Sequence, residues 1–337
     1  MKAVVLYDAG SSEWTQADVA AVMANVNEVR DVLRRHGWST RLVPVRLGDF
    51  TWLGRARRAD LVFNLCEGIN GHARFEDLVV GTLELTGVPI TGCRTWPTTV
   101  CHRKHVANTL LASVGVPVPT FVLAQGNRIP ADFPLPAIVK PAAEDASVGI
   151  DQQAVCSTRK ALRKRVAWLA EQFDEVLVQS YVSGREVNVG FVGSRMLPIS
   201  EIDFDALPDG HWPIVSYAAK WAPESDEYAG TDPVCPARLP ADTARRVGAA
   251  ARQAWEYLAG AEGYGRVDLR IADDGQPYVL EVNPCPDLSS DAGLARMAAA
   301  HGWSYDDLVM EIVEEALSRS QRSSAAAALA GGSSVPA

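Results

Sequence analysis

Two neighbouring segments in the last third of the chain carry oxygen-bearing side chains at strand-like spacing. RVDLR contains Asp268, and VLEVNP contains Glu281 and Asn283, with a DDGQP turn between them. Because side chains alternate along a strand, Glu281 and Asn283 share a face, and hairpin pairing can set Asp268 beside them. Such a cluster suits Mg²⁺ carrying a nucleotide's phosphates. A polar rim on an edge hairpin is the alternative, but these groups interrupt apolar residues such as Val267 and Leu280.

A lysine at the end of a β-branched stretch is the second feature with chemical potential. The segment IVKPAAEDASVG predicts a strand that ends at Lys140, then a loop of small residues that closes on Gly149. A lysine at a buried strand end is costly unless an anion meets it, and small residues let backbone N–H groups approach phosphate oxygens. A solvated lysine before a surface loop explains this segment, taken alone, equally well.

A third feature is the triplet Gly184-Arg185-Glu186, which opens a strand shortly after VLVQSYV. The Glu186 carboxylate can accept hydrogen bonds from ribose hydroxyls, and exposed backbone after Gln179 can read adenine. By itself, the triplet is equally consistent with a surface turn.

The first elements along the chain alternate between strands and helices. Apolar residues from Val19 to Leu33 recur three or four apart, and His36-Gly37 supplies a helix stop. The other expected elements are strands at 4–7, 41–45 and 60–65 and a helix at about 75–86. This alternation indicates a parallel sheet, so residues 1–96 are expected to form a small α/β domain.

Two further units and a tail are expected after residue 96. Residues 97–182 read as an α+β unit, and residues 183–318 as a third unit with a long Ala-rich helix. The strands are expected at 137–139, 176–179, 186–192, 266–271 and 278–283, and the helices at 104–113, 159–173 and 242–258. Residues 319–337 are small or polar, too poor in apolar surface to fold, and are predicted to be a disordered tail.

Composition excludes several classes of protein. The chain has 337 residues, of which 47% are hydrophobic and 22% charged, as in ordinary globular proteins of two or three domains. A formal net charge of −9 argues against a nucleic-acid partner. No apolar run approaches the roughly 20 residues that span a bilayer. The first residues, MKAVVLY, read as a strand rather than a signal peptide. We therefore expect a cytoplasmic protein without a membrane partner. The six cysteines lack CxxC spacing and are expected to be free thiols.

In their order along the chain, these motifs resemble the D-alanine–D-alanine ligase branch of the ATP-grasp superfamily. The further matching segments are FNLCEG (63–68), LELTGVPITG (83–92), Lys104 eleven residues before GVPVP, CPA (235–237) and HGWSYDDLV (301–309). The resemblance covers about residues 1–318. It implies an α/β (α+β) class and an ATP-grasp fold of three domains, with ATP between two antiparallel-sheet lobes, the central and C-terminal ones.

By motif position, the resemblance also assigns roles to residues. The residues assigned to nucleotide binding are Lys104, Lys140, Ser147, Gln179, Glu186 and Lys220. Two Mg²⁺ ions, for which Mn²⁺ can substitute, are assigned to Asp268, Glu281 and Asn283. Arg266 is assigned to the reacting carbonyl. Gln179 stands where the family usually has a glutamate that reads the adenine amine. The implied partners are a small-molecule carboxylate and an amine, and the resemblance suggests a homodimer.

The implied reaction has two steps. A substrate carboxylate attacks the γ-phosphorus of ATP to give an acyl phosphate and ADP, and an amine then displaces phosphate through a tetrahedral intermediate. Lysines and paired Mg²⁺ supply positioning and charge neutralisation in the first step. In the second, Arg266 is a fixed charge that can stabilise the developing oxyanion.

The donor side departs from the family pattern at two positions. Ala146 stands where the family has a serine, and Trp221, expected to line the substrate site, stands where it usually has a tyrosine. Those hydroxyls normally belong to one hydrogen-bond network with an N-terminal glutamate, for which Glu13 is the candidate. The network therefore cannot form here as it does in the dipeptide ligases.

The acceptor side departs further, in NPCPDLSSDAG. Asp287 replaces a glycine, and Ala292 replaces the serine that normally holds the acceptor's carboxylate. Because like charges repel in a partly dry site, we expect an acceptor that does not present a carboxylate there, with Asp287 pairing with a cationic or hydroxylated group. The alternative is that Asp287 points to solvent.

The leading hypothesis is an ATP-dependent ligase that joins a carboxylate, such as an amino acid, to an amine. A genuine D-alanine–D-alanine ligase of cell-wall synthesis is the rival within the fold. A nucleotide-binding protein without turnover is a rival of another class, although it would not need the full set of lysines and oxygen ligands. A small-molecule kinase that stops at phosphoryl transfer is the remaining alternative.

Overall fold

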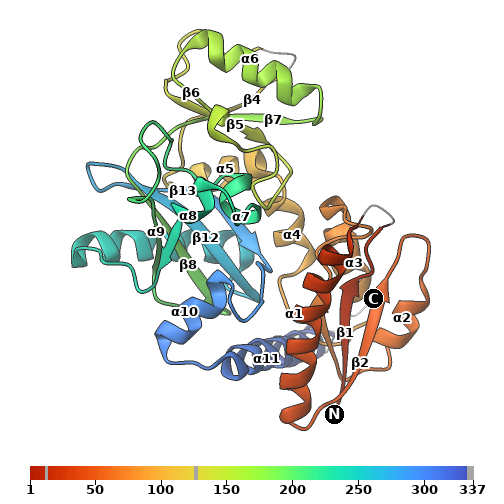
Figure 1. The fold of residues 1–337 in the computed structure, drawn as a ribbon. Helices are drawn as coiled ribbons and strands as arrows, with labels where there is room; N and C mark the ends of the chain where they lie inside the picture. The colour runs from red at the N-terminus through yellow and green to blue at the C-terminus, as the bar shows by residue number, and fades with distance from the viewer. Residues whose placement is uncertain (12–13, 125–127, 332–337) are drawn as a thin grey trace, which may run out of the picture.

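The computed structural model describes residues 1–11, 14–124 and 128–331, and its first sheet is formed near the N-terminus (Figure 1). The sheet has the order β2-β1-β3, and both pairings are parallel, as the sequence predicted. Its elements are β1 (Lys2–Asp8), α1 (Gln16–Arg35), β2 (Ser39–Val45), α2 (Thr51–Ala56), β3 (Leu61–Leu65) and α3 (Glu76–Glu84). Helix α1 begins with a capping box, in which Thr15 and Asp18 each accept a hydrogen bond from the other's backbone N–H.

The central unit is a four-stranded antiparallel sheet covered by helix α6 (Figure 1). The strand order is β4-β7-β5-β6. The elements of this unit are β4 (Phe121–Ala124), β5 (Ala137–Pro141), β6 (Val155–Cys156), α6 (Arg159–Ala170) and β7 (Val176–Ser180). The helices α4 (Thr95–Cys101) and α5 (Lys104–Ser113) precede it in the chain and pack against the third sheet. Leu162, Val166 and Leu169 of α6 recur at helical spacing and are buried on this sheet, which has a small hydrophobic core of its own.

The third sheet is larger and antiparallel, with the order β11-β10-β8-β12-β13 and β9 paired to β8. Its strands are β8 (Arg185–Val192), β9 (Arg195–Met196), β10 (Ser200–Asp203), β11 (Asp232–Val234), β12 (Tyr264–Ile271) and β13 (Pro277–Pro284). The helices around it are α7 (Tyr217–Trp221), α8 (Asp226–Ala229), α9 (Ala241–Ala259) and α10 (Gly293–His301). The β12–β13 hairpin confirms the pairing on which the predicted metal cluster depended.

Helix α11 (Tyr305–Gly331) corrects one prediction. Residues 319–331 were expected to be part of a disordered tail, but they continue this helix; residues 332–337 lie outside the described part of the chain. Arg319, only 4% exposed, donates to the carbonyls of Gly92 (2.9 Å) and Ile90 (2.6 Å). The error arose because alanine was counted as poor in apolar surface, although it is the best helix former and extends an already packed helix at little cost.

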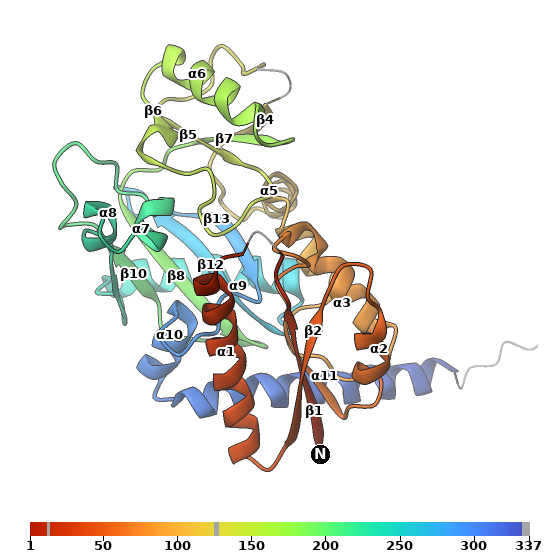
Figure 2. The ribbon, with the colours of Figure 1, turned by 45° about the vertical axis from the view of Figure 1, so that its right-hand side comes forward.

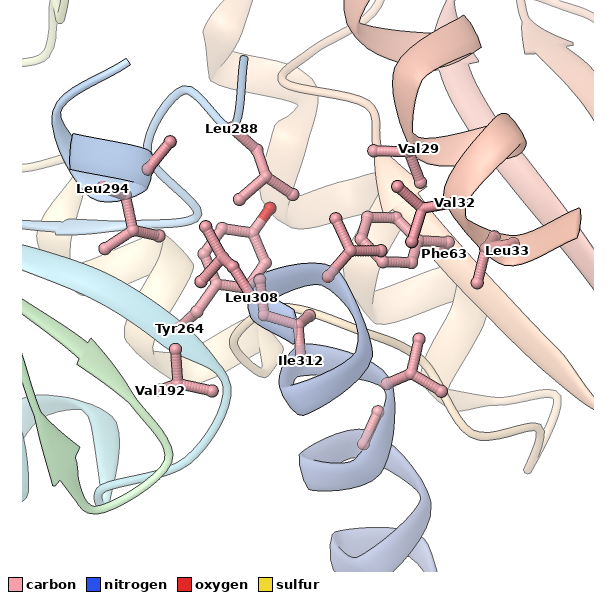
Figure 3. Packing of buried hydrophobic residues seen from close by; sticks show 14 of the residues in the cluster. Val29, Val32, Leu33, Phe63, Val192, Tyr264, Leu288, Leu294, Leu308 and Ile312 are labelled. Carbon is pink, nitrogen blue, oxygen red and sulfur yellow. The ribbon is translucent and has the colours of Figure 1, made fainter. Parts of the chain in front are cut away.

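The largest core joins the first and last parts of the chain (Figure 3). Val29 of α1, Phe63 of β3, Leu308 and Ile312 of α11, and Tyr264 of β12 belong to one cluster of buried side chains. Figure 2 shows α11 running behind α1 and the N-terminal sheet. The N-terminal and C-terminal units therefore share apolar burial, whereas the domain boundaries predicted at 96/97 and 182/183 stay predictions.

Two simpler expectations concern the cysteines and membranes. All six cysteines are free, as predicted. Among the residues that the structure describes, no helix has both the length and the apolar character required to cross a bilayer.

Candidate active site

Strand pairing in the third sheet brings the predicted polar residues together. Asp268 on β12 lies opposite Asn188 on β8 and opposite Glu281 on β13. Arg266 and Arg270, two residues to either side, share its face because side chains alternate along a strand. The sheet therefore carries a stripe of charged side chains on one face and the apolar core on the other.

Asp268 is the centre of a hydrogen-bonded cluster. Arg266 binds it with two parallel bonds of 2.6 and 2.8 Å, Asn188 donates at 2.7 Å, and Asn283 donates at 2.8 Å. The Asn283 amide also lies 3.4 Å from Glu281. Asp268, Glu281 and Asn283 thus come together as predicted, and Asn188 is a further member that no sequence motif indicated.

The metal ion that this cluster could bind depends on the ligand atoms that its side chains offer. In the described part of the chain, no three His, Cys, Asp or Glu side chains gather as a metal site would require. The cluster offers only two carboxylates, Asp268 and Glu281, with the Asn283 amide as a third oxygen source. This limited set fits Mg²⁺, because Mg²⁺ takes one or two carboxylates and completes its shell with water and substrate phosphates.

Three lysines surround Glu281 from different elements. Lys104, at the start of α5, donates to the Glu144 carbonyl (2.6 Å) and to Asp145 (2.8 Å) and lies 3.4 Å from Glu281. Lys140, at the end of β5, is 6% exposed and has no hydrogen-bond or ion-pair partner among the described residues. Lys220 lies in α7 on the cavity wall.

These positive charges act on Glu281 and on one another. Burial would raise the pKa of Glu281, but Lys104, Lys140, Lys220 and Arg266 outweigh it and hold that pKa well below its usual range. Burial lowers the pKa of Lys140, and the charge of Lys104 lowers it further. Glu281 opposes this effect, but it lies beyond ion-pair distance of Lys140, and a buried lysine without a hydrogen-bonded anion can bind one.

The loop after β5 has an unusual backbone. Ala146 and Ser147 adopt left-handed φ angles of +54° and +60°, which cost energy for residues with a Cβ and recur at ligand sites. The Ser147 hydroxyl donates to the Val215 carbonyl at 2.8 Å. The indole N–H of Trp221 donates to the Ala146 carbonyl at 3.1 Å. Trp221 therefore fixes this loop although the residue itself is 57% exposed.

The far end of the stripe contains an ion pair between buried side chains. Arg270 on β12 lies 3.1 Å from Glu186 on β8 and also donates to the carbonyls of Pro213 (2.7 Å) and Gly184 (2.7 Å). Burial raises the pKa of Glu186 although Arg270 opposes the effect. Gln179 on β7 is 1% exposed, and its side-chain nitrogen has no hydrogen-bond partner.

A cavity of about 570 Å³ lies between the central and third sheets and unites most of these groups. The predicted residues on its wall are Lys104, Lys140, Ser147, Gln179, Glu186, Lys220, Arg266, Asp268 and Glu281. Its volume is in the usual range for small-molecule sites. Three remaining predicted residues, Asn283, Trp221 and Asp287, are not part of that wall, and Glu13 lies outside the described residues.

Asp287 is exposed, as the alternative interpretation of the sequence allowed. Its carboxylate accepts a hydrogen bond from the Ser289 backbone N–H at 2.9 Å. The next residue of that loop, Ser290, donates hydrogen bonds to Glu28 of α1 from its backbone N–H at 3.0 Å and from its hydroxyl at 2.9 Å. The loop after β13 is therefore tied to the N-terminal unit.

Comparison with known proteins agrees with this geometry. A family model described as the C-terminus of D-ala D-ala ligase matches residues 110–314. A D-alanine–D-alanine ligase of Bordetella avium is 32% identical over 299 residues, which are 86% of this chain and 87% of that protein. The chain belongs to the D-alanine–D-alanine ligase family. Like the other members, it is an ATP-dependent carboxylate–amine ligase, as the sequence predicted.

Further similarities extend along nearly the whole ligase. An uncharacterized protein of Sinorhizobium fredii is 31% identical over 320 residues, covering 90% of this chain and 88% of that protein. The crystal structure of D-alanine–D-alanine ligase from Bacillus anthracis complexed with ATP has a TM-score of 0.74 at 23% identity and covers 96% of this chain and 99% of that chain. The VanG D-Ala:D-Ser ligase of Enterococcus faecalis has a TM-score of 0.73 at 21% identity, over 94% and 99% of the two chains. These structures share the ATP-grasp fold.

Proposed function

We propose that this ligase activates a carboxylate through an acyl phosphate and transfers it to an amine other than D-alanine. The observation that carries the proposal is the loop after β13. An exposed carboxylate, Asp287, and a methyl group, Ala292, occupy the positions where the resemblance implies a glycine and a serine hydroxyl. Neither side chain can donate a hydrogen bond to an acceptor's carboxylate.

The nucleotide's phosphates would be held by Lys104, Lys140 and Lys220, with backbone groups of the loop at Ser147. The unpartnered charge of Lys140 supports this role, because a phosphate would supply the anion that burial otherwise makes costly. Glu186 would accept hydrogen bonds from the ribose hydroxyls, and Gln179 would face the adenine base.

Two Mg²⁺ ions would be held by Asp268, Glu281 and Asn283, and Mn²⁺ has the same oxygen preference. The ions would neutralise charge on the transferring phosphoryl group. Arg266, which pairs with Asp268 and lines the cavity, would stabilise negative charge on the reacting carbonyl. Trp221, which donates to the Ala146 carbonyl, would border the donor substrate.

A pair of D-alanine molecules is the second candidate. The D-alanine–D-alanine ligases of the Bordetella species favour it, because they match this chain at 32–34% identity. A homodimer in the cytoplasm, where ATP and amino acids are available, is the expected setting for either activity.

The deciding experiment measures ADP release with Mg²⁺-ATP and a panel of D- and L-amino acids and amines, singly and in pairs, with mass spectrometry of the products. The proposal expects release only with a pair other than two D-alanines, and a product with the summed mass less water. Dipeptide from D-alanine alone would establish the second candidate. A stable phosphorylated product without condensation would make the protein a kinase, and nucleotide binding without any release would make it a binding protein.

A further inference from the structure

A row of ionisable side chains connects the N-terminal unit to the active site. Glu76 of α3, 6% exposed, lies 2.7 Å from Nε2 of His102. On the other side of the imidazole, Nδ1 lies 3.4 Å from one oxygen of Asp145, whose second oxygen accepts from Lys104 at 2.8 Å. Lys104 lies in turn 3.4 Å from Glu281. The row thus joins α3, the loop of residues 142–149 after β5, called the phosphate loop below, and the predicted metal ligands.

Lys104 has no free donor in this arrangement. An ammonium group has three N–H bonds, and Lys104 has three acceptors around it, the Glu144 carbonyl, Asp145 and Glu281. A phosphate can bind Lys104 only if one acceptor leaves. Asp145 is the one that can move most freely, because its side chain is 39% exposed whereas that of Glu281 is 24% exposed and the Glu144 acceptor is backbone.

His102 offers Asp145 another partner. Its side chain is only 13% exposed, and its Nδ1 is a buried ring nitrogen without a hydrogen bond, although it faces Asp145. Burial would lower the pKa of His102, but the hydrogen bond to Glu76 and the charges of Glu76 and Asp145 outweigh it and raise that pKa. The charged imidazole carries a proton on each nitrogen, so it can donate to both carboxylates.

We propose that His102 is a positioning residue that takes the Asp145 carboxylate from Lys104 when a phosphate binds Lys104. The inference rests on the proposed role of Lys104 in nucleotide binding. Exchange between the two cations keeps Asp145 paired and frees one N–H of the lysine. It also fastens the phosphate loop to Glu76 of the N-terminal unit when the nucleotide is in place.

The competing explanation is that His102 serves only as a structural partner for Glu76. The two explanations differ in whether the effect of His102 depends on Asp145. If His102 acts by accepting Asp145, removal of Asp145 makes His102 dispensable. If its role is structural, the loss on replacing His102 is the same whether Asp145 is present or absent.

The test is a double-mutant cycle on the full chain, with Mg²⁺-ADP affinity measured by isothermal titration calorimetry. His102→Asn is expected to weaken binding by about tenfold, the scale of one charge-assisted hydrogen bond. Asp145→Ala is expected to bind at least as tightly as the wild type, and adding His102→Asn to it to change affinity by less than about twofold. His301→Asn, at an exposed histidine on α10, is the matched control and is expected to change nothing.

An equal loss from His102→Asn in both backgrounds, or no loss in the wild-type background, would overturn the inference. If His102→Asn does not fold by circular dichroism, Glu76→Gln provides the second cycle, because it keeps the imidazole and weakens its hold on the second proton. Failure of the wild type to bind Mg²⁺-ADP would instead refute the proposed nucleotide site itself.

Discussion

Replacing Arg270 with Met tests whether Glu186 is kept charged by a buried ion pair. Arg270 is 3% exposed, and its guanidinium meets Glu186 at 3.1 Å and two backbone carbonyls at 2.7 Å. Met fills much of the same volume but offers no donor. The variant therefore leaves a buried carboxylate and two carbonyls without their partner.

The expected loss follows from this burial. Removing one partner of a buried ion pair costs about 3–5 kcal/mol, because the other charge stays desolvated. At about 2 °C per kcal/mol for a large domain, the midpoint of thermal unfolding should fall by about 6–10 °C. Thermal unfolding followed by calorimetry at pH 8 measures this change.

The size of the loss should also depend on pH. Burial already raises the pKa of Glu186 above its ordinary value of 4.5, and without Arg270 this pKa should rise further. A carboxylate with a raised pKa destabilises the folded state above its unfolded pKa, and this penalty disappears as the pH falls to that value. The deficit of Arg270→Met should therefore be smaller at pH 5 than at pH 8.

The double variant Glu186→Gln/Arg270→Met supplies the control. With the charge removed from both partners, much of the lost stability should return, as it does when buried ion pairs are replaced by neutral groups. A loss below about 2 °C for Arg270→Met, or a double variant as unstable as the sum of both single changes, would refute the reasoning.

Four other changes have definite expected outcomes. Lys140→Met should weaken Mg²⁺-ADP binding by at least about tenfold in calorimetry, because it removes a buried cation that has no hydrogen-bonded partner. Folding raises the pKa of His102 from 6.5. The charged imidazole therefore stabilises the folded protein fully below pH 6.5, and this contribution should be lost as the pH rises through the raised pKa. The difference in unfolding midpoint between the wild type and His102→Asn should accordingly shrink between pH 6 and 9. Asp287→Gly should change the acceptor preference in the ADP-release panel, and an unchanged preference would exclude contact with the acceptor. Arg319→Leu should lower stability by about 2–4 kcal/mol in denaturant unfolding, because it leaves two buried carbonyls unpaired, whereas Arg322→Leu, at an exposed position, should change it by less than about 0.5 kcal/mol.

The sequence was sufficient for the part of the site that depends on local periodicity. Alternation along a strand placed Glu281 and Asn283 on one face, and a short turn brought Asp268 opposite them. The same alternation runs from Arg266 through Asp268 to Arg270, so the role of Arg270 could have been predicted from RVDLR. Its partner Glu186 lies in register on β8.

Contacts between units could not be predicted in the same way. His102 and Glu76 are 26 positions apart and meet only because α3 and α4 pack together. Neither residue belongs to a motif that the sequence alone singled out for chemistry. The last turns of α11 were missed for another reason, because their small residues were read as too poor in apolar surface to fold, although alanine extends a helix that is already packed.

The shared core beneath α11 has a mechanical consequence. Apolar side chains of α1, β3, β12 and α11 pack into one cluster, whereas the sheet of residues 121–180 has a small core of its own. We therefore expect the N-terminal and C-terminal units to move as one rigid body, and the sheet of residues 121–180, with Lys140 and the phosphate loop, to move relative to it. A disulfide engineered between α1 and α11 should leave turnover intact, whereas one between that sheet and the rigid body should trap the nucleotide.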